Sequence, residues 1–331
     1  MNFPFSLYNR KVTFEKHILS GYYSKEDLYM IAGIVAEANK AIKYGDYMAA
    51  VRLLEPEDEA NPYVLSTLGK AFFFLGRFEE SYKIYHRLFC EDVVKREEAE
   101  VPFDEYDPDG REMMVTLENL GIPQMTEKLP KAVSFLYPQS EESPKEIYEE
   151  SKKLQELMDE CARKAKDDEK LAMKLILDKI DVLLNSKDQR EAALGWFYQG
   201  ELNFRRKDYM EAYKCYLKAA TTEVHKALYY GYAGNMLMKL REQNPNLLGI
   251  ASVLTNRAIE LDFNNAKWHY NQGLILMGLS KVFGTGGSGH QAFLKAAKKE
   301  FAFAHQTLRI EQLKLRDEIE AIYDDVRQLI Y

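Results

Sequence analysis

Residues 196–219 read WFYQGELNFRRKDYMEAYKCYLKA, and a pattern within this stretch decides the fold. Large and small side chains alternate along it at fixed steps of three, one, three, nine, four and three residues. The pattern is carried by Trp196, Gln199, Gly200, Asn203, Ala212, Tyr216 and Ala219. Because residues three and four apart share one face of a helix, the pattern predicts two helices joined by a turn near residues 207–209.

The same pattern returns before and after this stretch. With identical steps it runs through Leu65, Leu68, Gly69, Phe72, Ser81, Tyr85 and Leu88. With five extra residues in its turn it runs through Tyr230, Ala233, Gly234, Leu237, Ala251, Thr255 and Ala258. With twelve extra residues in its turn it runs through His269, Gln272, Gly273, Leu276, Ala297, Phe301 and Ala304. A weaker copy, cut short by Pro56, contains Ile34, Glu37, Ala38, Ala41, Ala50 and Leu54. Each hairpin buries its two apolar stripes against each other, and the recurrence of the pattern predicts a stack of such hairpins.

Small and aromatic residues at fixed places indicate how such hairpins would pack. A glycine in the first helix, such as Gly69 or Gly200, lets two helices approach closely. An aromatic ring from the second helix, such as Tyr85 or Tyr216, fills the space between them. The chain is expected to reverse direction at residues 45–47, 76–78 and 207–209.

On these markers the sequence resembles the tetratricopeptide repeat (TPR) family, whose unit is a helix–turn–helix of about 34 residues. The stretch 258–266 is similar to the family's junction between repeats, with Phe263 where proline is usual. The resemblance covers residues 24–92 and 193–311. It implies an all-α fold of tetratricopeptide-type hairpins stacked into a right-handed superhelix, an α-α superhelix, with an irregular insertion and a C-terminal capping helix.

The implied organisation has five segments. They are an N-terminal repeat block of about two hairpins (1–92), an irregular insertion rich in proline and acidic residues (93–143), a divergent helical hairpin (144–190), a C-terminal block of three repeats (193–311) and a capping helix (312–331). Apolar residues in the insertion, Met114 and Leu117 among them, predict that it packs on neighbouring helices. Whether the two repeat blocks form one superhelix or two lobes stays open.

An apolar stripe marks the end of the chain, where Leu315, Ile319, Ile322 and Val326 follow one another at steps of four, three and four. A helix that covers the last repeat is the favoured interpretation, because terminal repeats need a cap. The alternative is a homodimer in which the same four residues form a two-stranded coiled coil.

Composition favours a helical, intracellular protein. The chain has 46% hydrophobic and 29% charged residues, and its net charge of -7 argues against a nucleic-acid surface. Its three cysteines lie far apart, which predicts neither a disulfide framework nor a zinc site and favours a reducing compartment. Neither a secretory signal nor an apolar run of about 18 residues is evident. We therefore expect a cytoplasmic location without membrane insertion.

Two short motifs fit known ligand-binding loops only in part. Residues 284–289 read GTGGSG, but the segment before them is a predicted repeat helix where a dinucleotide-binding fingerprint needs a strand. A turn is therefore favoured over an anion-holding loop at Gly284–Gly289. Glu105, Asp107 and Asp109 are spaced like the start of a calcium-binding loop, but Thr116 stands where the closing glutamate is required.

The sequence also shows no set of residues spaced as in a catalytic site. His225, His269 and His305 lack the spacing of metal ligands or of a catalytic dyad, and no nucleophile–histidine–acid arrangement emerges. The sequence therefore predicts no enzyme activity, no cofactor and no metal.

The resemblance implies that a partner binds on the inner surface formed by the first helices of the repeats. The positions it assigns to this surface are Tyr63, Lys70, Phe73, Phe197, Tyr198, Glu201, Tyr232, Asn235, Lys267, Tyr270 and Asn271. Such an aromatic, mildly polar lining suits an extended peptide or an amphipathic helix. The alternative for these rings is packing between hairpins. Some family members hold a chaperone's C-terminal carboxylates with a lysine–asparagine clamp, but Gly231 stands where its first lysine is expected.

The function predicted from these observations is a non-catalytic scaffold, an adaptor or co-chaperone that holds a segment of a partner protein. A peptide-sensing regulatory repeat protein and a self-assembling architectural repeat protein are the alternatives.

Overall fold

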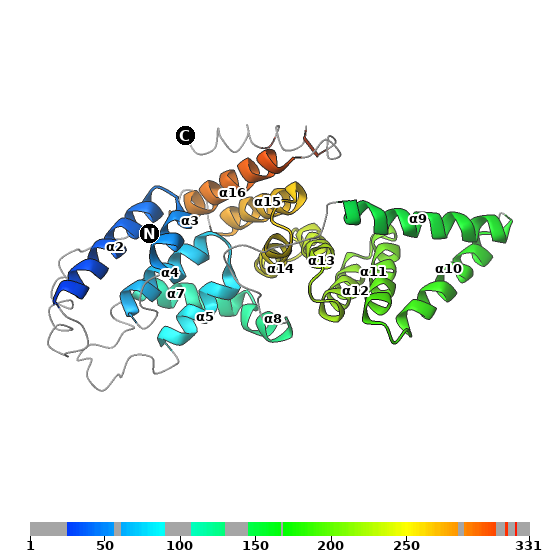
Figure 1. Cartoon of the computed structure of the whole chain (residues 1–331), viewed down its shortest axis with the longest axis horizontal. Coiled ribbons are helices and arrows are strands. Elements are labelled where there is room, and N and C mark those ends of the chain that lie inside the picture. Colours follow the sequence, from blue (N-terminus) through cyan, green and yellow to red (C-terminus); the bar gives the residue numbers. More distant parts are fainter. Residues whose placement is uncertain are drawn as a thin grey trace.

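The computed structural model describes residues 25–55, 61–89, 107–129, 145–166, 168–283, 288–308, 315–316 and 322. Each element within these residues is a helix, and Figure 1 shows their arrangement. The helices are α2 (Lys25–Lys43), α3 (Tyr47–Leu54), α4 (Pro62–Phe74), α5 (Phe78–Phe89), α7 (Pro108–Asn119), α8 (Ile122–Lys128), α9 (Lys145–Ala165), α10 (Glu169–Leu184), α11 (Gln189–Arg205), α12 (Tyr209–Thr222), α13 (Ala227–Lys239), α14 (Leu247–Leu261), α15 (Ala266–Val282) and α16 (Ser288–Thr307). The prediction of an all-α fold is confirmed.

Helices α9 to α16, which we call the C-terminal array, form four successive hairpins (Figure 1). The two helices of each hairpin pack together, and α10, α12 and α14 also pack against the first helix of the next hairpin. The predicted small–aromatic pairs hold the hairpins closed. A Cβ atom at Gly200 would lie 2.6 Å from the Tyr216 ring, and one at Gly273 would lie 2.5 Å from the Phe301 ring. Helix pairs therefore approach closely where the sequence pattern places glycine.

The predicted turns at residues 45–47, 76–78 and 207–209 are confirmed. Gly45 and Gly76 have φ angles of 78° and 72°, in the left-handed region where glycine is favoured, and Lys207 has a φ of 63° in the third turn. Asp46 and Asp208 then cap α3 and α12, because their carboxylates accept hydrogen bonds from backbone N–H groups of the first helical turn.

Residues 108–128 differ from the irregular insertion expected between 93 and 143, because they form α7 and α8. Asp107 caps α7 by accepting a hydrogen bond from the backbone N–H of Gly110 at 3.0 Å, and Pro108 occupies the first helical position. Asp107 and Asp109, two of the acidic residues that are spaced like a calcium loop, therefore begin a helix, while Glu105 lies outside the described residues. The predicted packing is confirmed, since Met114 and Leu117 are buried and α7 contacts α4 and α5.

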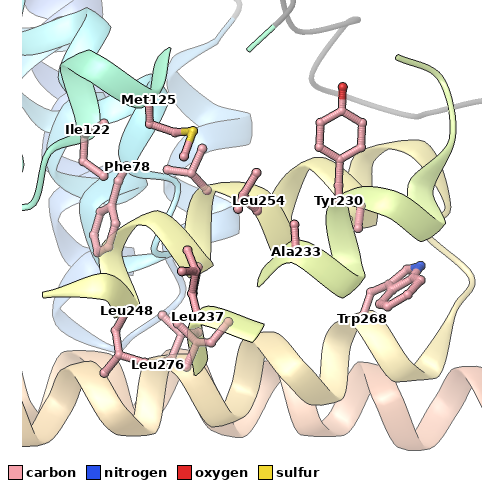
Figure 2. Packing of buried hydrophobic residues seen from close by; sticks show 14 of the residues in the cluster. Phe78, Ile122, Met125, Tyr230, Ala233, Leu237, Leu248, Leu254, Trp268 and Leu276 are labelled. Atoms are coloured by element: carbon pink, nitrogen blue, oxygen red, sulfur yellow. The ribbon is translucent and has the colours of Figure 1, made fainter. Parts of the chain in front are cut away.

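Helices α2 to α8, which we call the N-terminal block, lie alongside the C-terminal array. Helices α5 and α8 contact α14, and α4 contacts α16. Figure 2 shows Phe78, Ile122 and Met125 of the block beside α14, on which Leu248 and Leu254 are buried. The two blocks thus share one core in which segments far apart in the chain are neighbours.

Aromatic rings fill another part of this shared core. The Phe293 ring of α16 lies 5.9 Å from that of Phe73, 6.1 Å from that of Phe74 and 6.3 Å from that of Phe78. It also stacks on Phe283 at 5.1 Å. Burial of several rings is a large stabilising contribution, so this contact joins the two blocks firmly.

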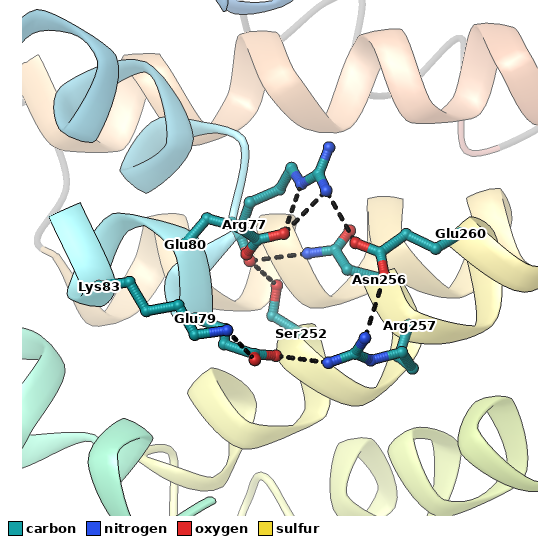
Figure 3. A network of polar contacts seen from close by, with 9 residues as sticks. Arg77, Glu79, Glu80, Lys83, Ser252, Asn256, Arg257 and Glu260 are labelled. Atoms are coloured by element: carbon teal, nitrogen blue, oxygen red, sulfur yellow. Dashed lines mark hydrogen bonds and ion pairs between the residues drawn. The ribbon is translucent and has the colours of Figure 1, made fainter. Parts of the chain in front are cut away.

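A network of charged side chains crosses the same boundary (Figure 3). The Arg77 guanidinium lies 2.8 Å from Glu80 and 2.7 Å from Glu260, while Arg257 lies 2.9 Å from Glu79 and 3.6 Å from Glu260. Burial and the charge of Glu80 raise the pKa of Glu260 to about 7, although two guanidinium groups oppose this shift. Glu260 therefore binds a proton more readily than a carboxylate in water, because burial outweighs the attraction of its two cationic neighbours.

The turn that contains Gly76 packs against α14 next to the residues of this network. Ser252 and Asn256 of α14 both donate hydrogen bonds to the Gly76 carbonyl, at 2.6 and 2.8 Å. A Cβ atom on Gly76 would lie within 3 Å of Ser252, Leu276 and Gln272. Glycine is needed here both for its φ angle and for this close approach.

Two further predictions concern residues at the edge of the described chain. Leu315 and Ile322 are half-buried against the core, whereas Ile319 and Val326 lie outside the described residues, so the capping helix at 312–331 stays a prediction. The homodimer through this stripe stays a prediction. Most of the Gly284–Gly289 loop also lies outside the described residues.

Among the helices that are described, none is both long enough and apolar enough to cross a membrane.

Candidate functional site

The candidate site is a surface made of one side of α13 and one side of α15. We call it the first-helix face and define it by the half-buried residues Tyr232, Asn235, Lys267, Leu274 and Met277. Tyr232 and Asn235 lie three residues apart on α13, and consecutive members of the set on α15 lie seven and three residues apart, so each set shares one side of its helix. The two helices are the first helices of the last two hairpins and contact each other directly.

Lys267 and Tyr232 form the most distinctive contact of this face. The Lys267 ammonium lies 4.3 Å from the centroid of the Tyr232 ring and 5.5 Å from that of Trp268. A cation held over aromatic faces is attracted by about 0.5–1 kcal/mol at an exposed site. Among the described residues, Lys267 has no carboxylate partner. Its charge is therefore available to a ligand.

The two predicted asparagines lie on neighbouring helices. Asn235 is half-buried on α13, and Asn271 is 4% exposed on α15. The Asn271 Nδ2 atom has no hydrogen-bond acceptor among the residues that the structure describes. Leaving a buried donor unsatisfied costs about 1–3 kcal/mol, so this group favours a ligand or water that can accept its hydrogen bond.

A layer of rings supports the face from within. Phe197 is fully buried, and its ring lies 5.5 Å from that of Tyr232 and 5.6 Å from those of Tyr216 and Tyr229. The Tyr216 hydroxyl donates a hydrogen bond of 2.6 Å to Glu201, and burial raises the pKa of Tyr216. Phe197 and Tyr216 thus pack against Tyr232, with ring centroids 5.5 and 5.4 Å from its own, and Glu201 holds the hydroxyl of Tyr216.

Tyr198 and Tyr270 are also mostly buried. Burial, with the charge of Glu150 on α9 adding to it, raises the pKa of Tyr198 to about 12. Tyr270 packs against Phe301 with ring centroids 5.9 Å apart. Both therefore contribute more to packing between helices than to exposed surface, and their role in binding stays a prediction.

The three predicted residues of α4 lie away from α13. Phe73 belongs to the aromatic contact between the two blocks, and Tyr63 is buried. Lys70 forms an ion pair of 3.5 Å with Asp109 at the start of α7. Spacing alone places these residues on the inner side of a first helix, but it does not show that α7 and α16 pack there.

Gly231 lies where the lysine–asparagine clamp would need its first lysine. A Cβ atom on Gly231 would overlap the six-membered ring of Trp268, which is fully buried. A lysine therefore has no room at this position. The sequence pattern did not identify Trp268 as the residue that packs on Gly231. A glycine in the first helix of a repeat is nevertheless a sign that a large side chain packs closely there.

Replacing Gly231 with alanine should lower the free energy of unfolding by about 1–3 kcal/mol, because the new methyl group displaces Trp268 in a filled core. Chemical denaturation followed by circular dichroism measures this change. Gly33→Ala is the matched control, since a Cβ atom at Gly33 in α2 meets no atom within 4 Å. It should raise the stability slightly, as alanine does in an open helix position. Equal stability of the two variants would contradict the tight contact at Trp268.

Comparison with known proteins does not place the chain in a family. A scan against protein-family models and a search of curated proteins find no match. Among solved structures, the chain is similar to the "TPR2AB-domain:pHSP90-complex of yeast Sti1", with 17% identity, 90% of this chain and 99% of that chain covered, and a TM-score of 0.30. A likeness at this identity and TM-score establishes neither a family nor a function.

Proposed function

We propose that the protein is a non-catalytic scaffold, an adaptor or co-chaperone, that holds a segment of a partner protein on the first-helix face. The observation that carries the proposal is the group formed by Lys267, Tyr232 and Asn271 on adjoining helices. It combines a cation that has no carboxylate partner among the described residues, a half-buried ring and a buried amide donor without an acceptor. A peptide supplies what these groups lack, because its carbonyl oxygens accept hydrogen bonds and its side chains cover the ring.

The packing of the molecule supports this proposal. Binding surfaces work best when rigid elements hold them, and Phe197 and Trp268 fix the two helices that carry the face. A cytoplasmic site of action is part of the proposal. It is supported by Cys161 and Cys215, which are both free thiols.

The test is capture of partners by the tagged full-length chain, with identification by mass spectrometry. Tyr232→Ala and Lys267→Met should each lower the affinity for a specifically captured protein by about tenfold or more, as changes at the centre of an interface do. Thermal unfolding of each variant checks that it remains folded. Tyr29→Ala and Lys214→Met are matched controls, because these residues are exposed on α2 and α12. If all four variants retain the same partners at the same affinity, binding on the first-helix face is wrong.

A further inference from the structure

A buried histidine links the last two hairpins of the array. His269 lies on α15 with 1% of its surface exposed. Its Nδ1 atom is 2.7 Å from the Glu300 Oε2 atom on α16, and its Nε2 atom is 2.7 Å from the carbonyl oxygen of Phe263, in the turn between α14 and α15. One side chain thus joins three elements.

Both partners of His269 are acceptors. A carboxylate oxygen and a backbone carbonyl have no hydrogen to donate, so both ring nitrogens must carry one for the two short contacts to be hydrogen bonds. The doubly protonated, positively charged imidazolium satisfies this requirement, whereas the neutral ring can donate from one nitrogen only.

The surroundings of the ring favour the same form. Phe263 and Phe303 flank it with centroids at 5.0 and 5.5 Å and limit access of water. The charged groups that face it are both carboxylates, Glu300 from α16 and the buried Asp262 from the end of α14. Burial alone would lower the pKa of His269, but the hydrogen bond and charge of Glu300, the Phe263 carbonyl and Asp262 raise it above its usual value.

We propose that His269 is a proton-dependent lock that ties the α14–α15 turn and α16 to α15. When the imidazolium loses a proton, one nitrogen lone pair faces an acceptor, and either the contact with Glu300 or the contact with Phe263 is lost. Because the pKa is raised in the folded state, the stabilising effect is complete below about pH 6.5, the usual value, and is lost as the pH rises through the folded-state pKa.

The lock lies beside the first-helix face, because Lys267, Tyr270 and Asn271 are on the same two turns of α15. Loosening α15 at higher pH would shift these side chains relative to α13. Binding of a partner on this face therefore weakens as the pH rises, a consequence that rests on the proposed function.

The direct test is a nuclear magnetic resonance titration of the histidine side chains of the full chain, with the His269 signals assigned through their loss in His269→Gln. The expected midpoint lies above about pH 6.5. In Glu300→Gln, where a neutral amide replaces the carboxylate, the midpoint should fall by about one pH unit or more. A His269 midpoint below pH 6.5, or one that Glu300→Gln leaves in place, would overturn the proposal.

Urea unfolding at two pH values gives a second readout that needs no partner. Raising the pH from about 6 to about 8.5, across the usual histidine pKa, should lower the urea midpoint of the wild-type chain more than that of His269→Gln. Glu260 also titrates near this range, so the difference between the two proteins is the quantity to measure. His225→Gln, a change of an exposed residue, should keep the wild-type response. Equal pH responses of the wild type and His269→Gln would contradict the lock, while partner capture tests the proposed function separately.

Discussion

Replacing Arg257 with methionine should lower the free energy of unfolding by about 3–5 kcal/mol, the range for breaking a buried ion pair by removing one partner. Arg257 is 5% exposed, and its guanidinium lies 2.9 Å from Glu79 and 3.6 Å from Glu260. Methionine fills much of the same space, but Glu79 and Glu260 each lose one cationic partner in a buried site, which leaves Lys83 for Glu79 and Arg77 for Glu260. Chemical denaturation at neutral pH measures the loss.

The pH dependence of this variant provides an internal check. Carboxylates that lose a cationic neighbour in a buried site bind protons more readily, so the folded variant should take up protons at a higher pH than the unfolded chain. Its deficit relative to the wild type should therefore shrink as the pH is lowered from 7 to about 5. Lys214→Met, which removes an exposed ion pair with Glu211, should leave stability almost unchanged at both pH values. A deficit for Arg257→Met as small as that of this control would show that the network does not hold the two blocks together.

Phe293→Ala should lower the free energy of unfolding by about 3–5 kcal/mol, because it leaves a cavity among Phe73, Phe78 and Phe283 in a fully buried site. The variant should also separate the unfolding of the two blocks. Both tryptophans, Trp196 and Trp268, belong to the C-terminal array, so fluorescence reports on the array whereas circular dichroism reports on all helices.

The two signals should change together in the wild type if the shared core makes unfolding cooperative. In Phe293→Ala, part of the circular dichroism change should occur at lower denaturant than the fluorescence change. Tyr29→Ala removes an aromatic ring that is 70% exposed and should alter stability by no more than about 0.5 kcal/mol. Coincident transitions in Phe293→Ala, at a stability close to that of this control, would contradict the aromatic contact as the joint between the blocks.

The repeats could be predicted from the sequence because their contacts are local. Gly200 meets Tyr216 and Gly273 meets Phe301 within single hairpins, where helical spacing and a short turn determine which residues face each other. Helix α7 had a recognisable start in Asp107 and Pro108, but the prolines and acidic residues around it favoured an irregular segment. Local composition and helix capping pointed in opposite directions there.

The position of the N-terminal block could not be predicted in the same way. No spacing in the sequence relates Arg77 to Glu260, because the pairing depends on how whole hairpins dock. The candidate site was predicted in part for a related reason. Lys267 and Tyr232 are at spacings typical of an inner surface, but the same spacing also fits Phe197, which is fully buried. Periodicity identifies a helix face and leaves open what covers it.

The shared core also sets an order of events during protein synthesis. Gly76 bonds to Ser252 across 176 residues of chain, and Asp46 pairs with Lys299 across 253. At translation rates of about 5–20 residues per second, the N-terminal block waits about 10–50 s for the helices that cover it. Throughout this interval Phe73 and Phe78 can pack on each other, at 5.5 Å between ring centroids, but both lack the Phe293 ring of α16. Folding is therefore completed only after α16 has left the ribosome, and the newly made block is most prone to aggregate before that moment.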